Sequence, residues 1–207
     1  MREIDPKTTS RAKAFDLWMK AAMPMVTMTK TFDITHLMRI SKRKGVKLNM
    51  LMCYSVVKAA SSFKEFYMLP VGDKLMEFDN IAINTIVMTS DGGINTCDIP
   101  FSEDIHTFEV DYLRITQQAQ QSADDVVLGD DYMVIGSSAL TKCELDSVVN
   151  VYAGFWNNPF VVWSKYRKRL FRTTLSLSFQ FHHTQMDGPI STGFLNRLQE
   201  VMNTLEY

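Results

Sequence analysis

The stretch LSLSFQFHHTQMDGPISTGFLNRLQ, residues 175–199, begins with a regular alternation of apolar and polar residues. Because successive side chains of a β-strand point to opposite faces of the sheet, this alternation predicts a strand with one apolar face. The predicted apolar face contains Leu175, Leu177, Phe179 and Phe181. His183 continues the apolar series and His182 the polar one, so the two histidines are expected on opposite faces.

The two histidines differ in their predicted surroundings. An imidazole among apolar side chains is disfavoured as a cation, and the neutral ring is the form that accepts a proton. His183 is therefore a candidate general base, although its position also fits a hydrogen-bonded histidine of the core. His182 is expected to be structural. Gly188 is expected to adopt a turn conformation that a side chain would obstruct.

Composition indicates one globular domain over residues 1–207, since 46% of the residues are hydrophobic and the formal net charge is −1. Basic residues are scattered apart from two short runs, SKRK (41–44) and KYRKR (165–169). Neither nucleic-acid nor membrane binding is therefore expected, although a small polyanion could use a local basic patch.

The cysteines and the N-terminus bear on the cellular compartment. Cys53, Cys97 and Cys143 are odd in number, far apart and in no CxxC spacing, which argues against a disulfide framework or a thiolate zinc site. The first fifteen residues are too polar for a signal peptide, and no apolar run has the length of a membrane span. We expect a soluble cytoplasmic protein in a reducing compartment.

Periodicity and turn residues predict interleaved helices and strands. Thr9 or Ser10 is expected to cap a first helix that runs to Ala22, and Ser102 to open a long helix. A closing helix is expected from about Ser191. Further strands are expected to include YMVIGSSAL (132–140), VVNVYAG (148–154) and PFVVWSKY (159–166), with hairpin turns at VGDK (71–74) and SDGG (90–93). The predicted fold is a two-layer α/β sandwich with a large mixed β-sheet and helices packed on one face.

Four segments carry a family resemblance. HHTQMDG (182–188) resembles the HHxxxDG motif of the chloramphenicol acetyltransferase family, whose shorter HxxxDG core also occurs in dihydrolipoamide acyltransferases. TSRAKAFDLW (9–18) is similar to the family's first helix, SSAL (137–140) to its active-site serine segment and FLNRLQE (194–200) to its last helix. The resemblance covers nearly the whole chain. It implies a coenzyme A-dependent acyltransferase fold, acetylation of a hydroxyl of chloramphenicol or a similar small molecule, and a role in antibiotic resistance.

The resemblance also assigns roles around the motif. It makes His183 the base that takes a proton from the acceptor hydroxyl, and Ser138 the donor to the oxyanion, although without it Ser138 would be one more small residue of a strand. It pairs Asp187 with Arg11, an arginine that would otherwise lie unfavourably near a helix N-terminus or extend its head to water. Acetyl-CoA is the cosubstrate, and neither a metal, a permanently bound cofactor nor a covalent intermediate is expected, because a thioester is already activated.

For the substrates, the resemblance places Lys47 and Lys165 near the phosphates of coenzyme A and Tyr166 near its adenine. Lysine is a suitable point charge for phosphate and an aromatic ring can stack on a base, although this basic run also fits a solvated hairpin turn. Leu17 and Trp18 align with residues that line the acceptor pocket. Ordinary packing of the first helix explains them equally well.

Several positions depart from the family pattern. Pro189 and Ile190 stand where an aromatic residue and a histidine usually follow the glycine, and Thr141 and Lys142 replace a Pro-Trp pair. Val162 replaces a threonine whose hydroxyl helps to hold the reaction intermediate. These changes concern the acceptor more than the reaction.

Three alternatives remain open from sequence. The acyltransferase could use another acceptor, or the chain could be a noncatalytic relative that binds coenzyme A or another ligand, as Val162 suggests. A freestanding dihydrolipoamide acyltransferase core is disfavoured, because such enzymes carry lipoyl and subunit-binding domains. The resemblance further implies a homotrimer with active sites between subunits.

Overall fold

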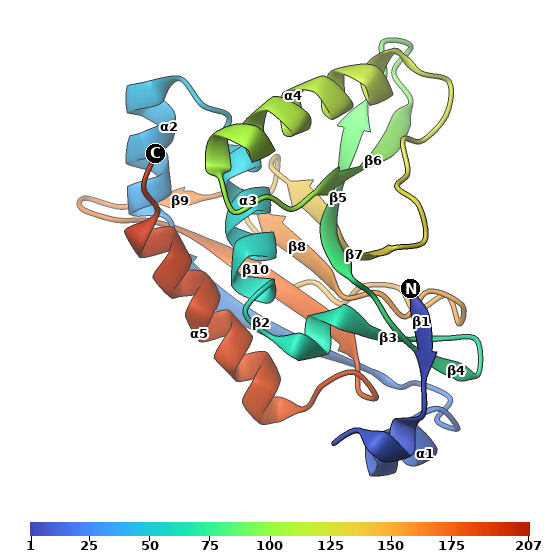
Figure 1. Ribbon diagram of the computed structural model, residues 1–207. Helices are drawn as coiled ribbons and strands as arrows, with labels where there is room; N and C mark the ends of the chain where they lie inside the picture. Colours follow the sequence, from blue (N-terminus) through green and yellow to red (C-terminus); the bar gives the residue numbers. More distant parts are fainter.

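The computed structural model describes residues 1–207 as two layers, a large mixed β-sheet with helices on one face (Figure 1). The strands are, in spatial order, β2 (Met25–Asp33), β10 (Thr173–His182), β8 (Phe160–Ser164), β7 (Tyr132–Leu140), β5 (Asn80–Met88) and β6 (Ile94–Pro100). The short β9 (Arg167–Lys168) pairs with β10. β7 runs parallel to β8 and β5, and the other pairs are antiparallel. The predicted sandwich is confirmed.

The helices and a smaller sheet complete the chain. The helices are α1 (Ala12–Trp18), α2 (Thr35–Lys44), α3 (Leu48–Ala60), α4 (Ile105–Gln121) and α5 (Gly188–Thr204), with short 3-10 turns η1 (Pro6–Thr8) and η2 (Lys64–Tyr67). The smaller sheet contains, in order, β1 (Arg2–Ile4), β4 (Lys74–Glu77) and β3 (Met68–Val71). It leads into α1, which lies apart from the other helices (Figure 1). None of the helices is both long and apolar enough to cross a membrane.

The main core lies between the sheet and the helix layer. Its centre is a cluster of three phenylalanine rings from η2, β10 and α5. The ring centroids of Phe179 and Phe194 are 4.7 Å apart, and Phe66 lies 4.8 Å from Phe194 and 5.9 Å from Phe179. Burial of such a ring stabilises the fold by roughly 2–3 kcal/mol. The predicted apolar face of β10 is therefore the face that anchors the helices.

The opposite, polar face of β10 is also buried, which the alternation did not predict. The segment between β7 and β8 crosses this face and uses its side chains as hydrogen-bond partners. Ser178 Oγ accepts from the backbone N–H of Val148 at 2.9 Å, and Gln180 Nε2 donates to the carbonyl of Asn150 at 3.1 Å. Ser178 and Gln180 thus form hydrogen bonds with a covering loop rather than facing solvent.

The strand predicted at residues 148–154 is wrong, because no strand of the chain pairs with this segment. Two of its backbone groups, the N–H of Val148 and the carbonyl of Asn150, are instead bonded to β10 side chains. Alternate residues face outward, so that Val149 is 71% and Val151 88% exposed. The strand-like pattern therefore produces an extended covering loop with an apolar outer side.

Two predicted helix starts are wrong. The N-cap residue of α1 is Arg11 rather than Thr9 or Ser10, and the helix ends at Trp18 rather than near Ala22. Arg11 occupies its N-cap position, and the backbone N–H of Arg11 donates to Thr9 Oγ1 at 3.0 Å.

The long helix begins after Asp104 rather than Ser102. The Asp104 carboxylate accepts from the N–H groups of His106 and Thr107 at 3.4 and 2.9 Å, because a carboxylate is the stronger acceptor for these free donors. The hairpin turns predicted at 71–74 and 90–93 are confirmed, with Gly72 and Gly92 at φ values of 59° and 89°.

Candidate active site

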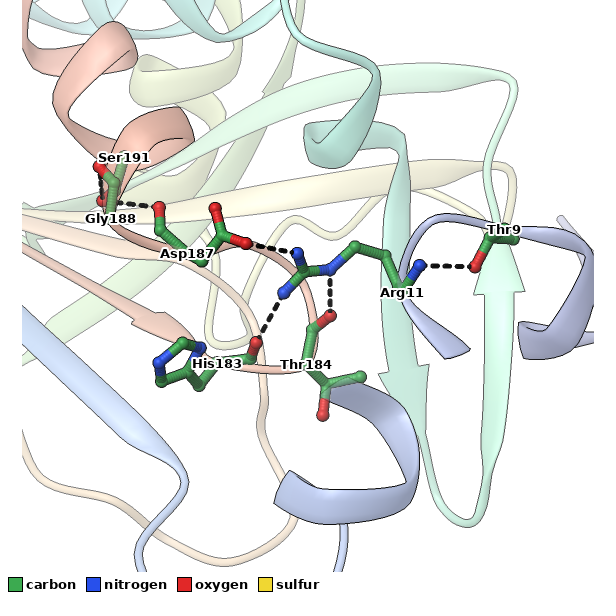
Figure 2. Close-up of polar contacts among 7 residues, drawn as sticks. All are labelled: Thr9, Arg11, His183, Thr184, Asp187, Gly188 and Ser191. Atoms are coloured by element: carbon green, nitrogen blue, oxygen red, sulfur yellow. Dashed lines mark hydrogen bonds and ion pairs between the residues drawn. The ribbon is translucent and has the colours of Figure 1, made fainter. Parts of the chain in front are cut away.

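The Arg11 side chain forms hydrogen bonds with the turn that joins β10 to α5 (Figure 2). Its Nη1 donates to Asp187 Oδ2 at 2.9 Å, its Nε to the carbonyl of Thr184 at 2.9 Å and its Nη2 to the carbonyl of His183 at 2.8 Å. The arginine is only 4% exposed, so its charge is neutralised and hydrogen-bonded inside the protein. One guanidinium therefore fixes both a side chain and the main chain of this turn.

The backbone of His183 is held from both sides. Its N–H donates to the carbonyl of Pro24 at 2.8 Å, while its own carbonyl accepts from Arg11. A residue whose main chain is fixed at both polar groups presents its side chain in one direction with little freedom. Arg11 is thus placed to position the imidazole without touching it.

The imidazole of His183 lies against aromatic rings. The ring of Trp18, the last residue of α1, stacks on it with centroids 4.4 Å apart and planes 7° apart, and Phe181 meets it edge-on at 6.5 Å. Its Nδ1 is enclosed without a hydrogen-bond partner, whereas Nε2 is neither enclosed nor bonded within the chain. Leu17, which was predicted with Trp18 to line the acceptor pocket, is 57% exposed. The imidazole thus has one nitrogen available to a ligand.

The turn conformation predicted for Gly188 is wrong. It is the first residue of α5, has no positive φ, and a Cβ at this position would meet no atom within 4 Å. The turn expected at Gly188 is instead formed by the residues before it, which Arg11 holds in place through hydrogen bonds. Asp187 occupies the N-cap position, and its carbonyl accepts from the Ser191 N–H and hydroxyl at 2.9 Å each.

Ser138 lies at the opposite end of the sheet from His183. It is in register with Val162 on β8, which is in turn in register with Ser178 on β10. Since His183 follows Ser178 by five residues and β10 lies two strands from β7, the two Cα atoms are roughly 19 Å apart from strand geometry. Within one chain, Ser138 and His183 do not reach a common carbonyl.

Two of the coenzyme candidates lie at the Ser138 end. Lys165 and Tyr166 directly follow β8, whose last residue Ser164 is in register with Leu140 of β7. Lys165 is exposed, and Tyr166 packs partly buried against the core. Lys47 is exposed at the N-cap position of α3.

The candidate residues therefore form two groups. The histidine half-site consists of Arg11, Trp18, His183 and Asp187. The serine half-site consists of Ser138, Val162, Lys165 and Tyr166. They occupy opposite ends of the same sheet.

His182 is buried on the covered face and is 2% exposed. Its Nδ1 accepts from the N–H of Thr184 at 3.1 Å, which stabilises the same turn. Burial, and secondarily the neighbouring His183, lowers the pKa of His182 from 6.5 to about 4. The ring is thus neutral and structural in character.

Acid should destabilise the protein through His182. Because its folded-state pKa lies below that of the unfolded chain, its contribution is fully present above pH 6.5 and is lost as the pH falls toward 4. Between pH 7 and 4.5 the free energy of unfolding should fall by about 2 kcal/mol more than in His182→Asn, which keeps an acceptor for Thr184. Urea denaturation at both pH values measures this difference. Equal losses in parent and variant would contradict the assignment.

Two solved acetyltransferases have this arrangement of helices and sheet. A chloramphenicol acetyltransferase superimposes with a TM-score of 0.86 at 19% identity, covering 97% of this chain and 99% of that chain. A probable dihydrolipoamide acetyltransferase from Listeria monocytogenes gives 0.70 at 16% identity, covering 100% of this chain and 95% of that chain. The fold is that of the coenzyme A-dependent acyltransferases.

The family follows from the sequence match. The family model described as chloramphenicol acetyltransferase matches residues 1–199, so the chain belongs to that family and is an acyltransferase. Chloramphenicol acetyltransferase 3 of Escherichia coli is 27% identical over 208 residues, covering 98% of this chain and 97% of that protein. A Clostridium perfringens chloramphenicol acetyltransferase is 24% identical over 208 residues, covering 98% and 95%. The family resemblance read from the motifs is confirmed.

Proposed function

We propose that the protein is an acetyl-CoA-dependent O-acetyltransferase that acetylates a hydroxyl of chloramphenicol or a similar small molecule. The observation that carries the proposal is the imidazole of His183, backed by Trp18, with its main chain fixed and Nε2 free for a ligand. Membership of the chloramphenicol acetyltransferase family supports the acyl donor and the class of acceptor. The cytoplasm is the proposed compartment, where the three free cysteines remain reduced.

The proposed reaction balances without a covalent enzyme intermediate. His183 Nε2 takes the proton as the acceptor oxygen attacks the thioester carbon, which forms a tetrahedral oxyanion. The hydroxyl of Ser138 donates a hydrogen bond to that oxyanion. The carbon–sulfur bond then breaks, and the departing thiolate takes the proton from the imidazolium. The products are the acetyl ester and free coenzyme A.

This reaction requires the two half-sites to meet, and the separation of roughly 19 Å within one chain excludes that inside a single subunit. We therefore place each active site in a cleft between subunits of a homotrimer, where His183 of one copy faces Ser138 of the next. Exposed apolar side chains on the segment between β7 and β8 support a subunit interface on the face of the sheet opposite the helices. They are Val149, Val151, Phe155 and Trp156, each at least 71% exposed.

Removing the Ser138 hydroxyl should lower kcat/KM about a hundredfold, because the developing oxyanion loses a donor. Release of free thiol from acetyl-CoA with chloramphenicol as acceptor measures the change. Ser137→Ala is the matched control, since the Ser137 hydroxyl donates to the carbonyl of Asn84 at 2.7 Å and points away from the proposed site. Equal activity of Ser138→Ala and the parent would remove Ser138 from the mechanism.

Mixed trimers test the shared cleft. When His183→Ala and Ser138→Ala chains are co-expressed in equal amounts, about one quarter of the clefts combine an intact histidine with an intact serine. Activity should therefore return to about a quarter of the parent value, although each variant alone is nearly inactive. Mixed samples as inactive as the single variants would overturn the arrangement.

A noncatalytic role is the second candidate, and Val162 is the observation that favours it. Its side chain is 4% exposed and lies in register beside Ser138, where it provides no hydrogen bond to an intermediate. Calorimetric binding of coenzyme A without thiol release for any acceptor in a panel of small alcohols would support that role. Release with an acceptor other than chloramphenicol would instead keep the enzyme and change its substrate.

A further inference from the structure

The fold brings together two basic runs that are more than a hundred residues apart in the sequence. The α2 helix, which ends in SKRK (41–44), lies beside the hairpin of β9 and β10 that contains KYRKR (165–169) (Figure 1). A cleft of about 410 Å³ separates them. Its cationic lining residues are Arg39, Lys42, Lys168, Arg169 and Arg172.

The charges of this cleft are almost uncompensated. Only Arg172 has an acidic partner, Asp33, with 3.7 Å between Nε and Oδ2, and Arg172 is 77% exposed. The other four cations form no ion pair. Although the chain as a whole has a formal charge of −1, this face carries a concentrated positive potential.

The tip of the hairpin is apolar. The N–H of Arg169 donates to the carbonyl of Arg172 at 2.8 Å, which closes the turn around Leu170 and Phe171. These two side chains are 88% and 82% exposed. Solvation of two large apolar groups at a turn is unfavourable, and flanking arginines make the tip amphipathic.

We propose that α2 and the β9–β10 hairpin form a docking surface for an anionic phospholipid bilayer. Leu170 and Phe171 enter the boundary between headgroups and acyl chains, and the five cations contact lipid phosphates. A free polyanion or a nucleic acid would use the cations but would leave the apolar tip in water. A bilayer accounts for both the cations and the apolar tip. This proposal differs from the expectation, drawn from the scattered basic residues of the sequence, that the protein does not bind membranes.

Vesicle sedimentation of the full-length protein tests this surface. The protein should bind vesicles containing roughly one third phosphatidylglycerol in phosphatidylcholine, should not bind phosphatidylcholine alone, and should be released by high salt. Leu170→Ser/Phe171→Ser and Arg39→Glu/Lys42→Glu should each reduce the vesicle-bound to free ratio by about tenfold or more. Circular dichroism verifies that each variant is folded.

The chain offers a matched control hairpin. Met88 and Ile94, which pair at the turn between β5 and β6, are each 68% exposed and lie outside the basic cleft. Met88→Ser/Ile94→Ser should bind vesicles like the parent. Thiol release without vesicles should be equal in all these variants, so a failure of the proposed acetyltransferase activity is observed separately.

Three outcomes would overturn the proposal. One is no binding to the anionic vesicles, and another is parent-like binding by the serine tip variant. The third is binding of tripolyphosphate or of a single-stranded oligonucleotide that blocks the cleft but is insensitive to the tip substitutions. That result would assign the cleft to a free polyanion.

Discussion

Replacing His183 by alanine should lower kcat by about 10³- to 10⁴-fold and change KM little. The reason is that Nε2 takes the proton of the acceptor hydroxyl only during the reaction step, whereas binding of the substrates depends on the other side chains that surround the pocket. Steady-state thiol release with acetyl-CoA and chloramphenicol gives both constants.

The matched control is His182→Asn, which changes the adjacent imidazole and keeps a hydrogen-bond acceptor for the turn. It should retain most of the activity at pH 7, because His182 faces away from the proposed site and stabilises the turn only through Thr184. A His183→Ala protein that retains more than about a tenth of parental kcat would rule out general-base catalysis by this residue.

The second large effect is expected at Arg11. Arg11→Met should reduce the free energy of unfolding by about 3 kcal/mol, because it leaves two carbonyls of a buried turn without their donor. It should also lower kcat, since the main chain of His183 is released on one side. Urea denaturation and thiol release measure the two effects separately.

Two further variants separate charge from geometry. Arg11→Lys keeps the positive charge but loses the forked contact to the carbonyls, so it should restore stability only in part. Asp187→Asn keeps an oxygen acceptor but leaves the buried guanidinium without its counter-charge, so it should reduce the free energy of unfolding by about 2 kcal/mol, less than Arg11→Met because the Asp187 side chain is 43% exposed. If Arg11→Lys matched the parent in both stability and kcat, the charge alone would account for the role of Arg11.

The fold was predictable where local pattern and burial agree. The alternation in β10, the nearly all-apolar α3 and the two glycine turns each have one dominant local cause, and the structure contains them. The segment 148–154 has the same local pattern but no partner strand in the chain. Whether such a segment joins a sheet depends on what lies beside it, and the local sequence carries no information about that.

Only the side chains of the candidate site could be predicted from the sequence, and not its backbone contacts. The sequence singled out His183, Asp187 and Arg11, which the structure brings together. It gave no sign that Arg11 also holds the carbonyls of His183 and Thr184, because every residue has a backbone carbonyl. The two basic runs were visible individually, but their convergence depends on how α2 packs against the end of β10.

The α1 helix has no buried residue, yet it supplies the indole that covers the imidazole. Elements with so little packing open at a small fraction of the free energy needed to unfold the central sheet. We therefore expect the two sides of the pocket to differ in mobility, with an indole that swings aside readily and an imidazole that stays in place.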